Sequence, residues 1–400
     1  MRCRSCLLVL GLMAIGLAYL LYSPFPDGAV DLQQQRVMSI FTAALLNMCD
    51  FQEYVGYSTL TKCATNPFNL LKVRTAEELS DDDVMVNEEL FDGVKVRLYT
   101  PRDSRLKRPL PALIFFHGGG FIIGSVDQYD SFTRILATSI PAVVVSVGYR
   151  LAPEFTFPIP FQDCLAATKY FMRHADRFGV DANRIALSGD SAGGNLAMAV
   201  GTKLTQERQP PRLLGLIYPA LQMVDLKTPS YNTYTSSPFL LRSERMVQFY
   251  LRHIFGNDDD LHKFLENQHL TKKMRESVKS KVNVDLLPEK YKSQYRAQDL
   301  KPVDKSLAER AEKIITNVFA FPLMLEDEML SKLPKAYLVT CEYDPLRDDG
   351  LMLAKRWKDL DFPVKHVHWD GIQHGFFPAY FLNRSREATA DFVAYLKKEL

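Results

Sequence analysis

The stretch Gly189-Asp190-Ser191-Ala192-Gly193 follows the apolar run Arg184–Ser188 and precedes a helical pattern that continues from Asn195. When a strand turns sharply into a helix, the residue at the turn is held in a strained conformation, and glycines on either side remove the clashes. The free N–H groups at the start of the helix then face any negative charge that develops beside the turn. The pattern therefore predicts that Ser191 is a nucleophile and that Asp190 supports its turn.

Apolar runs and helical patterns alternate on both sides of this stretch. Further buried strands are expected at Ala112–Phe116, Ala142–Val147, Leu213–Tyr218, Ala336–Thr340 and Val364–Val367, and helices at 160–174, 192–206, 347–360 and 385–399. Val84–Val86 and Val94–Tyr99 flank the turn Phe91-Asp92-Gly93, which predicts an antiparallel hairpin at one edge. Strands buried on both faces with helices between them predict a mostly parallel, doubly covered α/β sheet.

Two regions depart from this alternation. Residues 222–330 are long, irregular and partly helical, so we predict a helical cap inserted over the carboxyl ends of the strands, where ligands bind in such sheets. Residues 30–75 form a loosely amphipathic helical pattern, and the segment 24–80 that contains them is predicted to supply the other half of the cap. The catalytic core then comprises 81–221 and 331–400. An apolar stretch near the end of the insertion has three interpretations, namely packing, a substrate tunnel or contact with a membrane (Phe319, Phe321, Leu323 and Met324).

A glycine cluster ends the predicted strand Ala112–Phe116. In His117-Gly118-Gly119-Gly120 the backbone N–H groups are free to approach a tetrahedral oxyanion, and with the N–H of Ala192 they would form an oxyanion hole. A flexible glycine turn is the alternative interpretation. The order of the two motifs, each at a strand end, favours the oxyanion hole.

A serine nucleophile needs a base, and the base needs an acid that fixes its tautomer. Asp344 follows the predicted strand Ala336–Thr340 almost immediately, and His374 follows the last predicted strand. Asp348 is the alternative acid, although it would also suit the start of the next helix. The sequence therefore predicts a triad of Ser191, Asp344 and His374.

A second group of possible ligands lies in the last strand. His366 and His368 would share one face of that strand, with Asp370 beyond them, as in some zinc sites. No other ligand cluster accompanies them, and Gly371 stands where a further histidine is usual. We therefore expect no metal and no other cofactor, and we interpret both histidines as surface residues.

The N-terminus carries the clearest compositional signal. Cys6–Tyr22 is apolar and uncharged, and its 17 residues would make a helix of roughly 26 Å. Arg2 and Arg4 precede the run, which places residues 1–4 in the cytosol and everything after the helix on the far side. We predict an uncleaved signal anchor at residues 5–23. A cleaved signal peptide is the alternative, but the run lacks a small-residue cleavage site.

That topology would place the body of the chain in an oxidising compartment. Four cysteines there (Cys49, Cys63, Cys164 and Cys341) allow three pairings, and we expect Cys164 and Cys341 to be buried free thiols. Asn383 begins the one sequon, so it is a candidate for glycosylation. The 49 basic and 47 acidic residues nearly balance, which argues against nucleic acid as a partner.

The motifs together resemble the arylacetamide deacetylase family, in the hormone-sensitive-lipase-like branch of the α/β-hydrolases. The resemblance covers nearly the whole chain and includes Tyr149 to Glu154, Tyr218-Pro219-Ala220 and Asp344 to Gly350 as well as the motifs above. It implies Ser191 as nucleophile, Asp344 as acid, His374 as base, and Gly118, Gly119, Gly120 and Ala192 around the oxyanion. It also implies a type II anchor in the endoplasmic reticulum membrane, a lumenal active site, and lipophilic esters or aryl amides as substrates.

The predicted function is therefore a membrane-anchored serine hydrolase that acts through an acyl-enzyme. The alternative is a non-catalytic binder of hydrophobic ligands on the same fold. Retention of His374 beside Ser191 and Asp344 argues against that alternative. The partners expected are a lipophilic substrate and membrane lipid around the anchor, and no oligomeric state is predicted.

Overall fold

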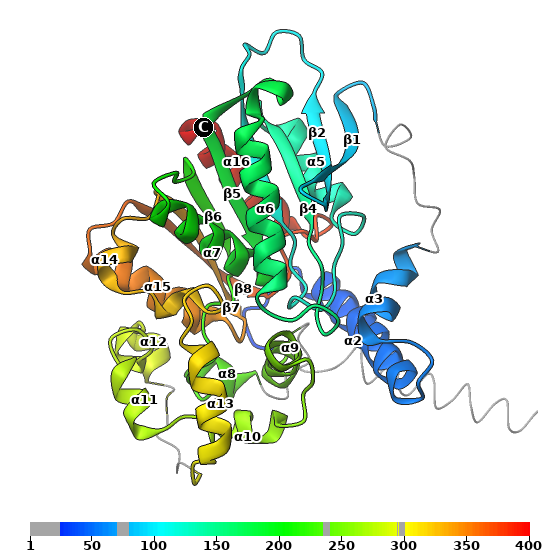
Figure 1. Cartoon of the computed structure of the whole chain (residues 1–400). Helices are drawn as coiled ribbons and strands as arrows, with labels where there is room; N and C mark the ends of the chain where they lie inside the picture. Colours follow the sequence, from blue (N-terminus) through cyan, green and yellow to red (C-terminus); the bar gives the residue numbers. More distant parts are fainter. Residues whose placement is uncertain (1–24, 70–79, 235–240, 294, 296–300) are drawn as a thin grey trace, which may run out of the picture.

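The computed structural model describes residues 25–69, 80–234, 241–293, 295 and 301–400 (Figure 1). The predicted cytosolic tail, 1–4, and signal anchor, 5–23, lie outside these residues. Among the described residues, no helix is both long enough and apolar enough to span a bilayer.

Eight strands form one sheet in the order β1-β2-β4-β3-β5-β6-β7-β8. Their bounds are Val84–Phe91, Val94–Pro101, Leu110–Phe116 (β3), Val143–Gly148 (β4), Val180–Asp190 (β5), Leu213–Ile217 (β6), Ala336–Tyr343 (β7) and Val364–Gln373 (β8). Strands β1, β2 and β4 pair antiparallel, whereas β4, β3, β5, β6, β7 and β8 pair parallel. The mostly parallel sheet and its antiparallel edge hairpin are confirmed. Asp92 and Gly93 turn the hairpin with φ of 47° and 86°, as a two-residue turn of this hand requires.

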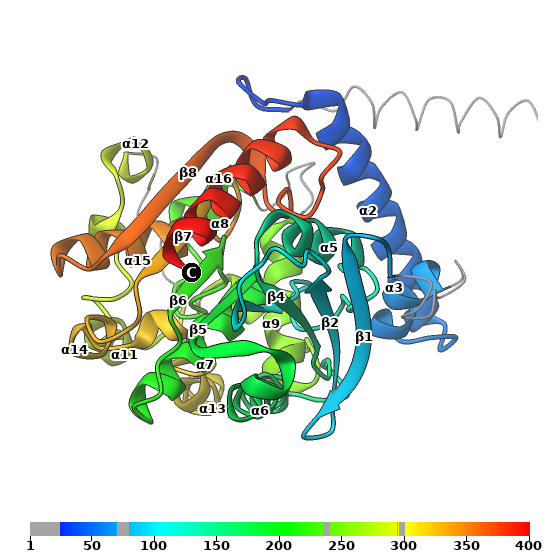
Figure 2. The ribbon, with the colours of Figure 1, turned by 90° about the horizontal axis from the view of Figure 1, so that it is seen from above.

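Helices cover both faces of the sheet (Figures 1 and 2). Along β3, Ile114 and Phe116 point into the larger apolar core, while Leu113 and Phe115 point into the other. The larger core is completed by α6 (Ile159–Arg173), α7 (Ala192–Gln206) and α15 (Arg347–Asp359), and the smaller one by α5 (Asp130–Ser139) and α16 (Asn383–Glu399). The period-2 alternation of a strand thus feeds two separate cores. Of these helices, α5 was not expected from the sequence.

Several helices follow β6 and precede β7 in the chain, and in Figure 1 they lie at the carboxyl ends of the strands. Their bounds are Pro229–Thr233 (α8), Ser243–Phe255 (α9), Leu261–Leu265 (α10), Lys272–Ser277 (α11), Glu289–Lys292 (α12), Lys305–Ile315 (α13) and Asp327–Leu330 (α14). The apolar stretch at the end of this region packs inside the protein, since Phe321 and Leu323 are fully buried and Phe319 stacks on Phe161 at 5.1 Å. The division into core and cap stays a prediction, because both segments share one apolar core.

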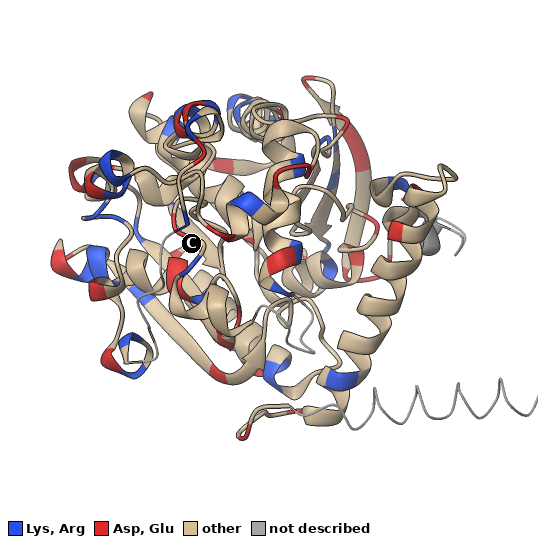
Figure 3. Cartoon of the chain, turned by 90° about the horizontal axis from the view of Figure 1, so that it is seen from below, with Lys and Arg blue, Asp and Glu red and all other residues tan. Residues whose placement is uncertain are grey.

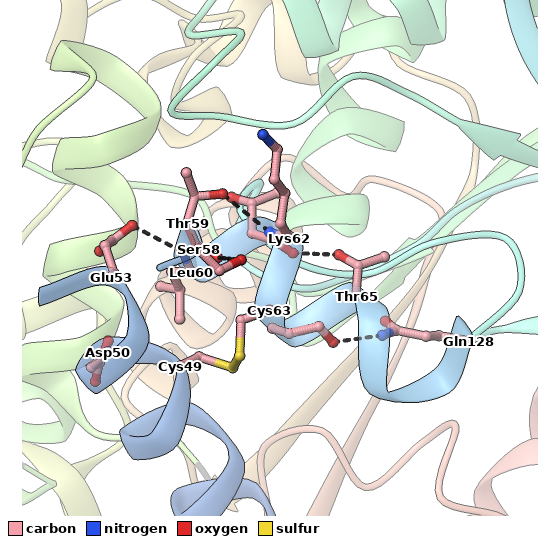
Figure 4. The surroundings of a disulfide bond; sticks show 12 residues. Cys49, Asp50, Glu53, Ser58, Thr59, Leu60, Lys62, Cys63, Thr65 and Gln128 are labelled. Carbon is pink, nitrogen blue, oxygen red and sulfur yellow. Dashed lines mark hydrogen bonds between the residues drawn. A yellow bond between two sulfur atoms is a disulfide. The ribbon is translucent and has the colours of Figure 1, made fainter. Parts of the chain in front are cut away.

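The N-terminal helical pattern forms two helices, α2 (Leu32–Tyr54) and α3 (Leu60–Asn69). A disulfide between Cys49 and Cys63 joins them, with 5.4 Å between the two Cα atoms (Figure 4). The structure thus selects one of the three pairings that the sequence left open. Cys164 and Cys341 are free and buried, as expected.

Candidate active site

Ser191 lies at the turn between β5 and α7. Its φ of 56° and ψ of −119° are strained for a residue with a side chain, and its N–H donates to the carbonyl of Ile217 at 2.8 Å. The turn brings Gly193 against β3 so closely that an added Cβ would lie 1.9 Å from the carbonyl oxygen of Phe116. Glycine is therefore required at position 193. The local sequence, through this close approach, fixes where the serine hydroxyl points.

Three predicted residues meet beside this turn. Nε2 of His374 lies 2.9 Å from Oγ of Ser191, and Nδ1 of His374 lies 2.8 Å from Oδ2 of Asp344. All three side chains are buried, and Asp344 is fully so. The ring of Tyr218 packs on the imidazole at 4.5 Å between centroids. The arrangement allows His374 to accept the serine proton while Asp344 fixes its tautomer.

The loop after β7 separates the two candidate acids. The other carboxylate oxygen of Asp344 accepts the N–H of Leu346 at 2.7 Å, which orients the group toward His374. The alternative, Asp348, pairs instead with Arg347 and accepts the N–H of Ser230 at 2.7 Å. Asp348 thus ties α8 to α15 and does not contact the histidine.

The glycine loop after β3 is held by the residue that precedes the serine. Oδ1 of Asp190 accepts the N–H of Gly118 at 2.9 Å, and Oδ2 accepts the hydroxyl of Tyr129 at 2.9 Å. Burial raises the pKa of Asp190 to about 6, although Tyr129, the nearby His374 and Gly118 act against this rise. The N–H of Gly118 is therefore engaged in positioning the loop. Tyr129 was missed by sequence reasoning, since a lone tyrosine in an unpredicted helix region gives no local signal.

The remaining predicted oxyanion donors have backbone N–H groups free of hydrogen bonds to the described part of the chain. Gly119 has a φ of 112°, and an added Cβ would lie 2.1 Å from the carbonyl oxygen of Ile123, so only glycine fits there. Gly120 follows it, and Ala192 opens α7 on the other side of the serine. Donors from a glycine loop and from a helix N-terminus are the two halves of an oxyanion hole.

The side chain of His117 packs against this loop. Its Nδ1 lies 2.8 Å from the carbonyl oxygen of Gly118, and its ring stacks on Tyr149 at 4.3 Å. Burial lowers the pKa of His117 to about 4, so the ring is neutral at pH 7. These two contacts place His117, the first residue of the glycine motif, against the loop as a supporting side chain.

A cavity of about 210 Å³ opens over Ser191. Its walls include the glycine loop, helix α2 through Thr42 and Leu46, helix α9 through Met246 and Phe249, and Pro378 of the turn after β8. Most of the lining is apolar, which suits a lipophilic ligand. The sequence did not predict which residues of α2 and α9 line the cavity.

Comparisons with known proteins agree with this geometry. A family model described as alpha/beta hydrolase fold matches residues 113–284 and 276–378. Arylacetamide deacetylase of Mus musculus is 35% identical over 96% of this chain and 96% of its own length. The chain belongs to the arylacetamide deacetylase family of α/β-hydrolases.

Two further relatives support the class of activity. Neutral cholesterol ester hydrolase 1 of Rattus norvegicus is 34% identical over 93% of this chain and 92% of its own length. The crystal structure of an esterase from Pyrobaculum calidifontis, 27% identical, superimposes with a TM-score of 0.60 over 91% of this chain and 92% of that one. This arylacetamide deacetylase family member is therefore a carboxylesterase-type hydrolase.

The two histidines of the last strand, His366 and His368, make hydrogen bonds inside the protein, which differs from the exposed position expected from the sequence. His366 Nε2 and His368 Nδ1 both contact the hydroxyl of Thr340, at 2.9 and 2.8 Å, and the hydroxyl of Tyr291 contacts the other ring nitrogen of His368, Nε2, at 2.9 Å. Burial lowers the pKa of His366 to about 4. They do share one face, but they are partly buried and not surface residues. Among the described residues, no three His, Cys, Asp or Glu side chains are grouped to hold a metal.

Asn383 is exposed at the start of α16. Its Nδ2 donates to Oδ1 of Asp31 at 2.8 Å, and Oδ2 of Asp31 accepts the N–H of Arg384 at 2.8 Å. Asp31, the residue just before α2, thus supplies the acceptor that the first turn of α16 needs. Glycosylation of Asn383 stays a prediction.

Proposed function

We propose that this hydrolase uses Ser191 to cleave lipophilic carboxylic esters through an acyl-enzyme. The contact between His374 and Ser191, oriented by Asp344 at the floor of an apolar cavity, carries the proposal. In the first step Oγ of Ser191 attacks the ester carbonyl while Nε2 of His374 takes its proton. The proton then passes to the departing alkoxide, and water releases the acid by the same route in reverse.

The developing oxyanion would be stabilised by the N–H groups of Gly119, Gly120 and Ala192. One such donor is worth roughly 3–4 kcal/mol in the transition state. The carboxylate of Asp344 holds the imidazole of His374 in place and stabilises the imidazolium. Ester cleavage should outpace amide cleavage, because an alkoxide leaves more readily than an amine.

Substrate size is limited by the walls of the cavity. A volume of about 210 Å³ between α2 and α9 accommodates an acyl or aryl group beside Ser191. The names of the relatives, arylacetamide deacetylase and neutral cholesterol ester hydrolase 1, also point to apolar esters or aryl amides.

The deciding experiment is labelling with a serine-directed fluorophosphonate. Full-length wild type and Ser191→Ala would be expressed in membranes and assayed with a short p-nitrophenyl ester. We expect labelling and turnover in the wild type, with both lost in the variant by a factor on the order of 10⁶ in kcat. A folded wild type that resists probe and ester would favour a non-catalytic binder of hydrophobic ligands.

For location, we propose that residues 5–23 anchor the chain in the endoplasmic reticulum membrane, with the catalytic body in the lumen. The Cys49–Cys63 disulfide supports an oxidising compartment, since such bonds are rare in the cytosol. A shift in gel mobility on glycosidase treatment, absent in Asn383→Gln, would test the lumenal side. Retention in the pellet after alkaline carbonate extraction would test the anchor.

A further inference from the structure

The outward face of α2 is apolar although the helix lies at the molecular surface. Val37, Phe41, Met48, Phe51 and Val55 at its end have exposed fractions between 47% and 64%. At 100° per residue they fall within an arc of roughly 80°. We call these five residues the α2 outward face.

The inward face of the same helix is partly polar. Gln35 is fully buried and donates to the carbonyl of Gly371 at 3.0 Å, and buried Ser39 donates to the side chain of Gln373 at 3.0 Å. A surface helix in water has the opposite arrangement, with its apolar stripe toward the core. Along α2, two polar side chains are therefore buried while several large apolar side chains are exposed.

Charge is also absent along the middle of this helix. Residues 37–49 contain no acidic or basic side chain, and Figure 3 shows charged segments of α2 only toward its ends. A contiguous, uncharged apolar surface of this kind marks contact with another apolar phase or partner.

The turn between β8 and α16 extends the apolar surface. Phe381 in this turn has an exposed fraction of 56%. The next residues, Asn383 and Arg384, bond Asp31 at the start of α2, so the turn lies beside that end of the helix, as in Figure 2. Arg384 and Arg386 follow it as basic groups at the rim, and Arg384 also pairs with Glu387 at 2.8 Å.

The same two elements form walls of the cavity over Ser191. Thr42 and Leu46 of α2 line it, and so does Pro378 of the turn. The apolar surface therefore adjoins the cavity that receives the substrate.

We propose that the α2 outward face, together with Phe381, docks on the surface of a lipid bilayer and brings the cavity against it. The inference rests on the proposed ester hydrolysis and adds the phase from which the substrate enters. The apolar run Cys6–Tyr22 ends ten residues before Leu32, at most about 35 Å of extended chain. A bilayer that held that run would keep α2 within reach of its surface, and basic side chains at the rim suit anionic headgroups.

The depth that a tryptophan on α2 reaches in the bilayer tests the docking independently of catalysis. Full-length Phe41→Trp and Phe51→Trp would be reconstituted in vesicles of phosphatidylcholine and phosphatidylserine with brominated acyl chains. The matched control is Leu90→Trp, an equally exposed site on β1 beside Phe91, which stacks on Tyr170 of α6. Wild type, with its two native tryptophans, provides the background. We expect at least about twofold stronger quenching at 41 and 51 than at 90, because a docked helix face enters the acyl boundary.

Kinetics test the route of the substrate. Phe41→Ser/Phe51→Ser should lower the rate on a long-chain ester embedded in vesicles about tenfold, with kcat/KM for a soluble short ester unchanged. Met85→Ser/Leu90→Ser, also two exposed apolar residues, should change neither rate.

Each outcome has a separate meaning. Equal or absent quenching at positions 41, 51 and 90 overturns the docking. The docking is also overturned if a substitution in the α2 outward face dissociates a dimer, because that surface then binds a second copy of the chain. If wild type hydrolyses neither ester while tryptophan quenching follows the expected order, the docking stands and the proposed function fails.

Discussion

The sheet around Ser191 and the helix α2 bury opposite kinds of residue. In β3 every side chain is buried, and polar groups appear only where the strand ends, at the glycine loop. In α2 a glutamine and a serine are buried, while Phe41 and Phe51 are exposed. A hydrophobic pattern shows which residues leave water, but it does not show which apolar phase they enter.

The two regions also differ in what holds them. The strands are fixed by apolar packing on both faces. Helix α2 has a few apolar contacts, such as that of Leu46, together with hydrogen bonds and ion pairs to the body and a disulfide to α3. Substitutions at the strand ends should therefore alter chemistry, and substitutions along α2 should alter local order and access.

The largest expected effect is at the strand end of β7. Asp344→Asn keeps the size of the side chain but presents an amide to Nδ1 of His374, which favours the wrong tautomer. We expect kcat for a short ester to fall about 10⁴-fold, with the fold retained. A near-ultraviolet circular dichroism spectrum equal to that of wild type is the control, and a fall of less than tenfold would contradict the assignment.

Asp190 gives a second test in the same region, through pH. Its pKa in the folded protein is about 6, against an ordinary value of 3.8, so between these values the native state binds more protons than the unfolded state. Stability therefore falls as pH rises from about 4 to about 6, by about 3 kcal/mol for this group. Asp190→Asn should remove that fall, measured as the difference in urea unfolding between the two proteins at pH 4.5 and 7. The same pH dependence in both proteins would contradict it.

On the α2 side, the disulfide should stabilise one region only. It closes a loop with a sequence separation of 14, for which chain entropy gives about 3 kcal/mol. Cys49→Ala/Cys63→Ala should lose amide exchange protection in α2 and α3, while β5 and α7 keep theirs. Loss of protection across the whole sheet would instead mean that α2 is part of the same cooperative unit as the core.

The sequence located the strand-end residues because parallel strands bring their carboxyl ends to one edge in any such sheet. Ser191, Asp344 and His374 could be placed from that rule and from chain order alone. The end of β8 could not be predicted in this way, because its pairing with β7 continues past a register shift as far as Gln373. His368 pairs with Thr340 before that shift, one residue beyond the predicted end of the strand at Val367.

Residues that depend on distant packing left no local signal. Tyr129 reaches Asp190 across 61 positions, and Thr42 and Phe249 meet at the cavity from helices on different segments. The pairing of Cys49 with Cys63 was open for the same reason, since it depends on how α2 and α3 cross. Periodicity along one segment cannot report contacts between segments.

The smallest expected effect concerns the ion pair between α2 and α9. Asp50 accepts two bonds from the guanidinium of Arg245, one of them at 3.0 Å, and Arg245 also lines the cavity over Ser191. Both side chains are partly exposed, so the pair should contribute only about 0.2–1 kcal/mol. We expect Asp50→Asn to raise KM for a lipophilic ester about twofold and to leave kcat unchanged, because α2 then holds the cavity wall less tightly.

Glu53→Gln is the matched variant, one turn further along the same helix. Glu53 pairs with Arg252 at 2.7 Å and also accepts the N–H of Leu60 at 2.9 Å, so it orders the turn between α2 and α3 as well. Its substitution should affect amide protection of α3 more than Asp50→Asn does, again without changing kcat. A fall in kcat of tenfold or more in either variant would remove the distinction between the two regions, because α2 would then set the geometry of the reacting groups.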